Sequence, residues 1–116
     1  MKSSSVEVKA LDSPDAVWTF LDESERVAVQ LGKAAIGRGV YRPGWRWSRH
    51  AQPLSGSESE EHIGYVISGR MAVRGKDGTE VEVGPGEAFI AAAGSDAWVV
   101  GEEPCVALDF MTTAAR

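Results

Sequence analysis

The sequence of 116 residues has few of the features that mark secreted or membrane-inserted proteins. Its one cysteine, Cys105, cannot form a disulfide within the chain, and its apolar neighbours predict a buried, inert thiol. No segment approaches the roughly 20 apolar residues that a membrane-spanning helix needs. The first residues also contain no apolar run of the kind found in signal peptides. We therefore expect a cytoplasmic protein with no membrane partner.

Positive charge is also scarce. Lys and Arg number 12 against 17 Asp and Glu, which gives a formal net charge of −5. Nucleic-acid-binding proteins use a clustered basic surface to displace counterions from phosphates. Four arginines do gather between residues 38 and 49, but three glutamates between residues 58 and 61 offset them. We expect no nucleic-acid partner.

Short apolar segments separated by turn residues fill most of the chain. The 13 glycines and 5 prolines are spread throughout, and this spacing predicts an all-β fold. We expect strands at residues 6–11, 26–31, 34–41, 45–51, 62–68, 71–74, 79–83, 88–92, 97–100 and 105–111. A short N-terminal helical turn is expected over residues 13–21, because Ser13 can cap it and Pro14 suits its first turn. The length predicts that residues 1–116 form a single domain.

Residues 43–70 contain the clearest spacing pattern in the chain. Five residues separate Gly44 from His50, and six separate His62 from Gly69. His50 and His62 are the only two histidines in the sequence. By strand alternation, each can point to the interior of a barrel.

A second glycine-punctuated segment, residues 77–94, follows it, with Gly86 and Gly94 at turn positions. Together the two segments, over residues 44–101, resemble the two motifs of the cupin superfamily. The first motif runs G-x5-H-x-H-x3,4-E-x6-G, and the second runs G-x5-P-x-G-x2-H-x3-N. The resemblance implies a cupin β-barrel, in which a jelly-roll-like pair of antiparallel sheets encloses a cavity.

The ligand positions of a metal-binding cupin are only partly filled here. Such a cupin offers three histidines and a carboxylate, but the second histidine position holds Gln52 and the third holds Ala97. His62 stands at the glutamate position. His50, His62 and Gln52 are therefore the candidate ligands for a divalent iron, manganese, zinc or nickel ion. Glu58, in the loop before His62, either supplies the missing carboxylate or is simply solvated.

Alternation along the predicted strand at 45–51 adds further candidates. Arg46 and Ser48 share the face of His50, so Arg46 either reaches the barrel mouth to bind a carboxylate or phosphate, or lies on the surface. Trp45 and Trp47 have the opposite parity and are expected to pack outside the barrel. The predicted ligand pocket comprises Arg46, Ser48, His50, Gln52 and His62.

Two functions of different classes remain open. In the first, the domain binds a polar or anionic small molecule in its cavity and has no strong metal site. In the second, it is a metal-dependent enzyme of the dioxygenase, isomerase, cyclase or decarboxylase type, in which His50 and His62 hold the ion with Gln52 or Glu58. The missing ligand at Ala97 favours the first. The resemblance also implies a homodimer, and no other cofactor is expected.

Overall fold

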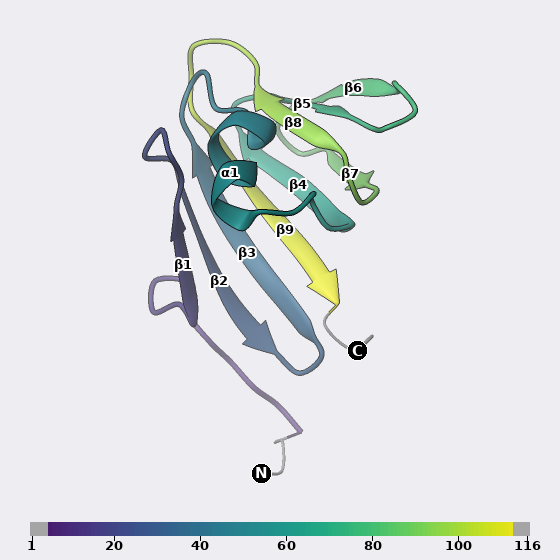
Figure 1. Cartoon of the computed structure of the whole chain (residues 1–116). Helices are drawn as coiled ribbons and strands as arrows, with labels where there is room; N and C mark the ends of the chain where they lie inside the picture. Colours follow the sequence, from purple (N-terminus) through teal and green to yellow (C-terminus); the bar gives the residue numbers. More distant parts are fainter. Residues whose placement is uncertain (1–4, 113–116) are drawn as a thin grey trace.

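Within residues 5–112, which the computed structural model describes, nine strands form two antiparallel sheets beside one short helical segment (Figure 1). The larger sheet contains, in spatial order, β1 (Ala16–Thr19), β2 (Glu25–Leu31), β3 (Ala34–Tyr41), β9 (Cys105–Thr112), β4 (His62–Ser68) and β7 (Ala88–Ala91). The smaller sheet contains β6 (Glu80–Val83), β5 (Met71–Arg74) and β8 (Asp96–Val99). This architecture confirms the predicted jelly-roll-like pair of antiparallel sheets.

Most of the predicted strands are present. Strands β3, β4 and β5 have the predicted bounds, and β2, β6, β7, β8 and β9 differ from them by one residue at their ends. The alternation in the sequence predicted these strands well because one face of each packs against the interior. In β4, for example, Gly64 and Val66 are buried whereas Ile63 and Tyr65 are exposed.

The predicted helical turn over residues 13–21 is wrong. Strand β1 occupies Ala16–Thr19 and pairs antiparallel with β2. A tight turn joins the two strands, because the Asp22 carboxylate accepts hydrogen bonds from both the backbone N–H and the hydroxyl of Ser24, each at 3.0 Å. With a partner strand this close, valine, tryptophan and threonine adopt the extended conformation that they prefer.

The predicted strand at residues 6–11 is also wrong. The segment lies outside both sheets, and β1 is the edge strand of the larger sheet. Figure 1 shows it as a purple trace that leads away from the strands. Its apolar side chains Val6 and Val8 are 80% and 91% exposed. Alternating apolar and polar residues therefore do not form a strand here, because the segment pairs with neither sheet.

The predicted strand at residues 45–51 is the third error. The chain makes a single bridge, between Arg46 and Trp98 of β8, and then turns into a helical segment. This segment consists of one π-helical turn, η1 (Trp47–Ala51), followed by α1 (Gln52–Ser55). No helix in the described part of the chain is long and apolar enough to cross a membrane.

One long-range and one local feature explain why this segment is helical. The Asp96 carboxylate in β8 accepts the Ser48 N–H at 3.0 Å, and Pro53 stands in the first turn of α1, where its missing N–H costs nothing. The change of conformation also reverses the predicted orientation of the tryptophans. Trp45 is only 3% exposed and belongs to the core, and Trp47 packs against that core.

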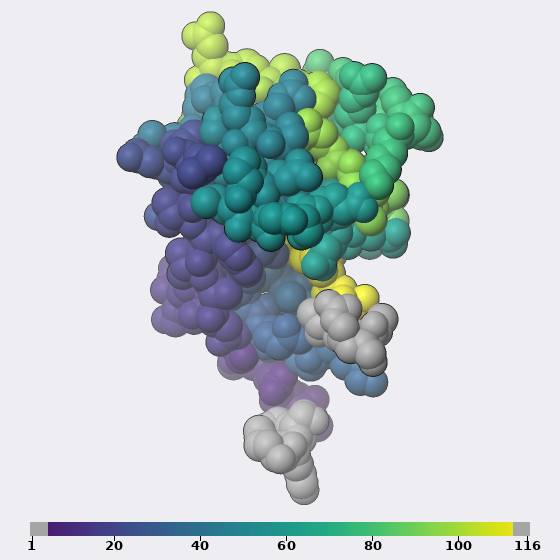
Figure 2. All heavy atoms as spheres, viewed as in Figure 1, coloured from purple at the N-terminus to yellow at the C-terminus, as the bar shows by residue number. Residues whose placement is uncertain are grey.

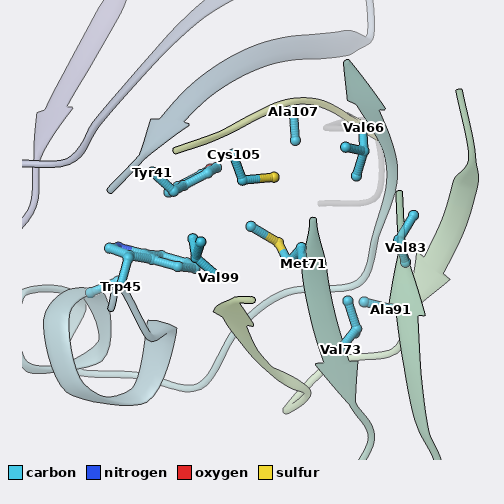
Figure 3. Close-up of a cluster of buried hydrophobic side chains, with 11 residues drawn as sticks. Tyr41, Trp45, Val66, Met71, Val73, Val83, Ala91, Val99, Cys105 and Ala107 are labelled. Atoms are coloured by element: carbon cyan, nitrogen blue, oxygen red, sulfur yellow. The ribbon is translucent and has the colours of Figure 1, made fainter. Parts of the chain in front are cut away.

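The buried core lies between the two sheets (Figure 3). Val66 of β4 and Cys105 of β9 are fully buried at its centre. Figure 3 shows Tyr41 and Trp45 beside each other at one end of the cluster. Burial raises the pKa of the Cys105 thiol to about 11, so the predicted buried thiol is confirmed.

An aromatic-lined cavity as the candidate functional site

A cavity of about 470 Å³ lies between the two sheets. Strands of both sheets contribute side chains to it, and the segment from Trp45 to Glu60 forms one of its walls. In Figure 2 this teal segment lies across the molecule, between the purple strands β1 and β2 and the green strands of the smaller sheet. The helical segment thus positions one side of the cavity.

Aromatic rings make up much of the cavity lining. Six of the nine Phe, Tyr and Trp residues in the chain line it: Trp18, Phe20, Tyr41, Trp45, Trp47 and Phe89. The rings of Tyr41 and Trp45 are 4.3 Å apart between centroids, and those of Phe20 and Trp45 are 5.8 Å apart. We call these three neighbouring rings the aromatic floor of the cavity. Tyr41 and Trp45 are also buried residues of the core.

Two inward-facing glycines create room for the side chains of neighbouring strands. A Cβ atom at Gly37 in β3 would lie 2.5 Å from the guanidinium of Arg26, and one at Gly64 in β4 would overlap the ring of Phe89. The side chains of Arg26 and Phe89 therefore lie directly against the backbone of these two glycines. We infer that these glycines fix the positions of the charged group and of one ring in the cavity wall.

Arg26 and Asp109 form an ion pair in the wall. The guanidinium donates two hydrogen bonds to the carboxylate, at 2.6 and 2.8 Å, and reaches from β2 across β3 to β9. The two side chains are only 16% and 13% exposed. Burial acts against the charge on Arg26, but the hydrogen bonds and charge of Asp109 outweigh it and raise the pKa of Arg26. The guanidinium also lies 4.6 Å from the ring centroid of Trp18.

His62 is the predicted pocket residue that lies in the cavity wall. Its Nδ1 is 3.0 Å from the backbone carbonyl oxygen of Glu60. Because a carbonyl only accepts, Nδ1 carries the proton and Nε2 is left with a lone pair in the neutral ring. The space that Gly64 leaves beside the imidazole is filled by Phe89, whose ring meets His62 edge-on at 6.0 Å.

Arg46, Ser48 and His50 are not among the lining residues. Arg46 pairs with Asp96 at 3.0 Å and lies 4.1 Å from the ring centroid of Trp98. Ser48 donates its N–H and its hydroxyl to Asp96, at 3.0 and 2.8 Å. Burial acts to raise the pKa of Asp96, but the hydrogen bonds from Ser48 and Arg46 hold it below its ordinary value. His50 accepts the Arg46 backbone N–H at Nδ1, at 3.0 Å.

Gln52 and Glu58 do not complete a metal site. Gln52 begins α1 outside the cavity wall, and Glu58, which is in the wall, pairs with Lys76 at 2.6 Å. Within residues 5–112, no group of three or more His, Cys, Asp or Glu side chains is arranged to hold a metal ion. The described residues therefore contain no set of three firm His, Cys, Asp or Glu ligands of the kind that catalytic metal centres use. The assignment of a metal to His50, His62 and Gln52 stays a prediction.

Sequence reasoning did not find the ion pair or the aromatic floor. Arg26 and Asp109 are 83 positions apart and meet only because β3 brings β2 and β9 together. The sequence did contain one signal, which is the alternation of side chains along a strand. Arg26 is two positions from the buried Ala28, and Asp109 is two positions from the buried Ala107, so each charged residue shares the inward face of its strand. A charged residue on the inward face of each of two strands indicates a buried pair.

Comparison with known proteins agrees with this architecture. The profile of the family described as "Cupin domain" matches residues 42–111, more than half of the chain. The protein therefore belongs to the cupin family. No match to the sequence was found among curated proteins.

Several solved structures share the fold. AerE from Microcystis aeruginosa is 18% identical with a TM-score of 0.63, and the match covers 79% of this chain and 42% of AerE. KdgF from Halomonas sp. is 20% identical with a TM-score of 0.58, over 78% of each chain. A Cupin 2 conserved barrel domain protein from Salinispora arenicola CNS-205 is 14% identical with a TM-score of 0.65, over 97% of this chain and 92% of that one. Identities this low establish the shared fold alone. The chain spans less than half the length of AerE.

Proposed function

We propose that this cupin domain binds a small organic molecule in the cavity and has no strong metal site. The observation that carries the proposal is the lining of the cavity, in which six aromatic rings surround a space of about 470 Å³. Binding sites for small molecules typically have a volume of about 300–1,000 Å³, mostly apolar walls and a few polar groups. The size and chemistry of this cavity match that description.

The polar groups of the wall favour a ligand without negative charge. Binding of an anion requires a cationic side chain that is available to it. One alternative from the sequence gave this role to Arg46, but Arg46 lies outside the wall and pairs with Asp96. The guanidinium in the wall, Arg26, is already held by Asp109. We therefore propose a ligand with an apolar body and a polar head that is not anionic.

A direct test of the metal-free part is elemental analysis of the purified protein, followed by thermal melts with added Fe(II), Mn(II), Zn(II) or Ni(II). We expect far less than one metal ion per chain and no rise in melting temperature, because within residues 5–112 no group of three or more His, Cys, Asp or Glu side chains is placed to hold a metal ion. Near-stoichiometric metal that is lost in a His50→Ala, His62→Ala double variant would instead support the metal-dependent enzyme.

Ligand binding itself is tested by thermal melts against a panel of small aromatic and aliphatic compounds. A ligand present at 100 times its Kd stabilises the folded protein by about 2.7 kcal/mol, which is readily detected. The variant Phe89→Ala, in the wall, should lose the response. The matched control Phe110→Ala, on a residue that is outside the wall and 38% exposed, should keep it. Equal responses in both variants would place the ligand outside the cavity.

We also propose that the protein forms a homodimer through the outer face of the larger sheet. Five apolar side chains, here called the outer patch, are 37–67% exposed on that face: Ile63, Tyr65, Ile67, Ile90 and Phe110. Ile63 lies opposite both Ile90 and Phe110 in the sheet register, so these side chains are contiguous. Contiguous exposed apolar patches mark interaction sites, and a two-fold axis can pack this face against its own copy.

Light scattering coupled to size-exclusion chromatography tests the dimer. The wild-type protein should elute with the mass of two chains, and Ile90→Lys should elute with the mass of one. Val81→Lys is the matched control, since Val81 is 46% exposed on the smaller sheet. A wild-type protein with the mass of one chain at high micromolar concentration would contradict the proposal.

A further inference from the structure

Most of the serine hydroxyls in the cavity wall are already engaged in hydrogen bonds. The wall contains four serines, and three of them donate their hydroxyls to backbone carbonyls: Ser55, Ser59 and Ser95. The fourth, Ser57, is exposed. The indole Nε1 of Trp45 is buried and has no hydrogen-bond partner among the described residues. Three of the four serine hydroxyls of the wall are therefore not available to a ligand.

The acceptors, in contrast, are free. The Nδ1–H of His62 is bound to the Glu60 carbonyl, which leaves the lone pair of Nε2. In the part of the chain that the structure describes, neither Nε2 nor the Glu60 carboxylate has a hydrogen-bond partner. Both residues line the cavity, and they are two positions apart in the chain. A ligand head that donates hydrogen bonds is complementary to this pair.

The charges of the wall also favour a ligand head that donates hydrogen bonds, and they favour one that is positively charged. Two of its four carboxylates are paired with basic side chains outside the wall, Glu58 with Lys76 and Asp96 with Arg46. The single guanidinium, Arg26, faces the other two: it pairs with Asp109 and is within electrostatic range of Glu60. Among the residues that the structure describes, one negative charge of the wall therefore remains uncompensated. The aromatic rings that line the same cavity also attract cations through their faces.

We propose that the cavity is specific for organic amines, with the protonated amine at His62 Nε2 and the Glu60 carboxylate and the apolar body against Phe20, Trp45 and Phe89. This inference rests on the proposed function, since it names the ligand class of that same cavity. The ammonium donates hydrogen bonds to these two acceptors and brings a positive charge to the Glu60 carboxylate. A carboxylate in the same place would meet two acceptors and an excess of negative charge.

Isothermal titration calorimetry with three ligands of one shape tests the proposal: phenethylamine, phenethyl alcohol and hydrocinnamate. They share a phenyl ring and a two-carbon linker and differ in their head, which is a cation, a neutral hydroxyl or an anion. At low ionic strength we expect phenethylamine to bind roughly tenfold more tightly than the alcohol, and hydrocinnamate to bind most weakly.

Two variants and a matched control locate the head. Glu60→Gln and His62→Phe should each weaken phenethylamine by roughly three- to tenfold and leave the alcohol nearly unchanged. Glu61→Gln removes the same charge from an exposed neighbour outside the wall and should change none of the three affinities. Thermal melts confirm that each variant is folded.

The outcomes separate the two proposals. If the alcohol or hydrocinnamate binds as tightly as the amine and Phe89→Ala weakens all three, the cavity binds small molecules and the amine specificity is wrong. If Glu61→Gln weakens the amine as much as Glu60→Gln does, the amine is attracted by general surface charge, and the assignment to the wall is wrong. If none of the three binds while another compound of the panel binds in a way that Phe89→Ala abolishes, the cavity binds small molecules and the amine specificity is wrong; if no compound of the panel binds, the proposed function is wrong as well.

Discussion

Replacing Asp109 with asparagine tests the ion pair that spans the cavity wall. Asp109→Asn keeps the size of the side chain and removes its charge, so the guanidinium of Arg26 is left without its bidentate partner. Because the two side chains are only 16% and 13% exposed, water cannot readily solvate the remaining cation. We expect a substantial loss in the free energy of unfolding.

The structure sets the size of this loss. Removing one partner of a buried ion pair typically costs about 3–5 kcal/mol. Arg26 keeps the Trp18 ring, 4.6 Å from its guanidinium, and the nearby charge of Glu60, so we expect about 2–3 kcal/mol. For a chain of roughly 100 residues, this lowers the melting temperature by about 10–20 °C. A domain with 5–15 kcal/mol of total stability remains folded at room temperature.

Urea denaturation followed by tryptophan fluorescence measures the change. The double variant Arg26→Met, Asp109→Leu should recover stability to within about 1 kcal/mol of wild type, because apolar pairs of similar volume often replace buried ion pairs without loss. Glu82→Gln breaks the exposed pair with Arg70, at 49% and 53% exposure, and should cost less than about 0.5 kcal/mol. An Asp109→Asn variant no less stable than Glu82→Gln would refute the reasoning.

Three further predictions follow from other contacts. Gly64→Ala would force its Cβ into the ring of Phe89, so we expect about 1–3 kcal/mol of destabilisation and weaker ligand binding, and unchanged binding would show that the ring position does not matter. Asp96 has a lowered pKa, so its contribution to stability is complete above its unfolded pKa of about 3.9 and is lost as the pH falls through the folded pKa. The difference in melting temperature between wild type and Asp96→Asn should therefore be largest at pH 6 and become smaller as the pH is lowered below about 4, and a constant difference would contradict this. Cys105 should react with iodoacetamide at pH 8 more than about a hundredfold more slowly in the folded protein than in urea, because its pKa is raised to about 11, and equal rates would contradict its burial.

The sheets could be predicted from the sequence because each strand carries its own signal. In β4, alternation placed His62, Gly64 and Val66 on one face, and the structure has all three facing inward. The same rule failed at residues 45–51, where an alternating segment is helical. The cause is the carboxylate of Asp96, about 50 positions away in the sequence, which binds the backbone of this segment.

The candidate site was harder to predict, because its parts come from strands whose register the sequence does not specify. The contact of Arg26 with Asp109 depends on the order β2, β3, β9 and on the room above Gly37. The burial of Trp45 depends on the helical turn that follows it. Family motifs identified the histidines but could not show that one of them, His50, is turned toward its own backbone.

A crystal structure of the protein soaked with para-bromophenethylamine tests the central claim most directly, because the anomalous signal of bromine locates the ligand body without ambiguity. The account predicts a bromine peak among Phe20, Trp45 and Phe89, with the amine nitrogen within hydrogen-bond distance of His62 Nε2 or the Glu60 carboxylate. A bromine peak outside the cavity, or a metal ion bound at His62, would contradict it.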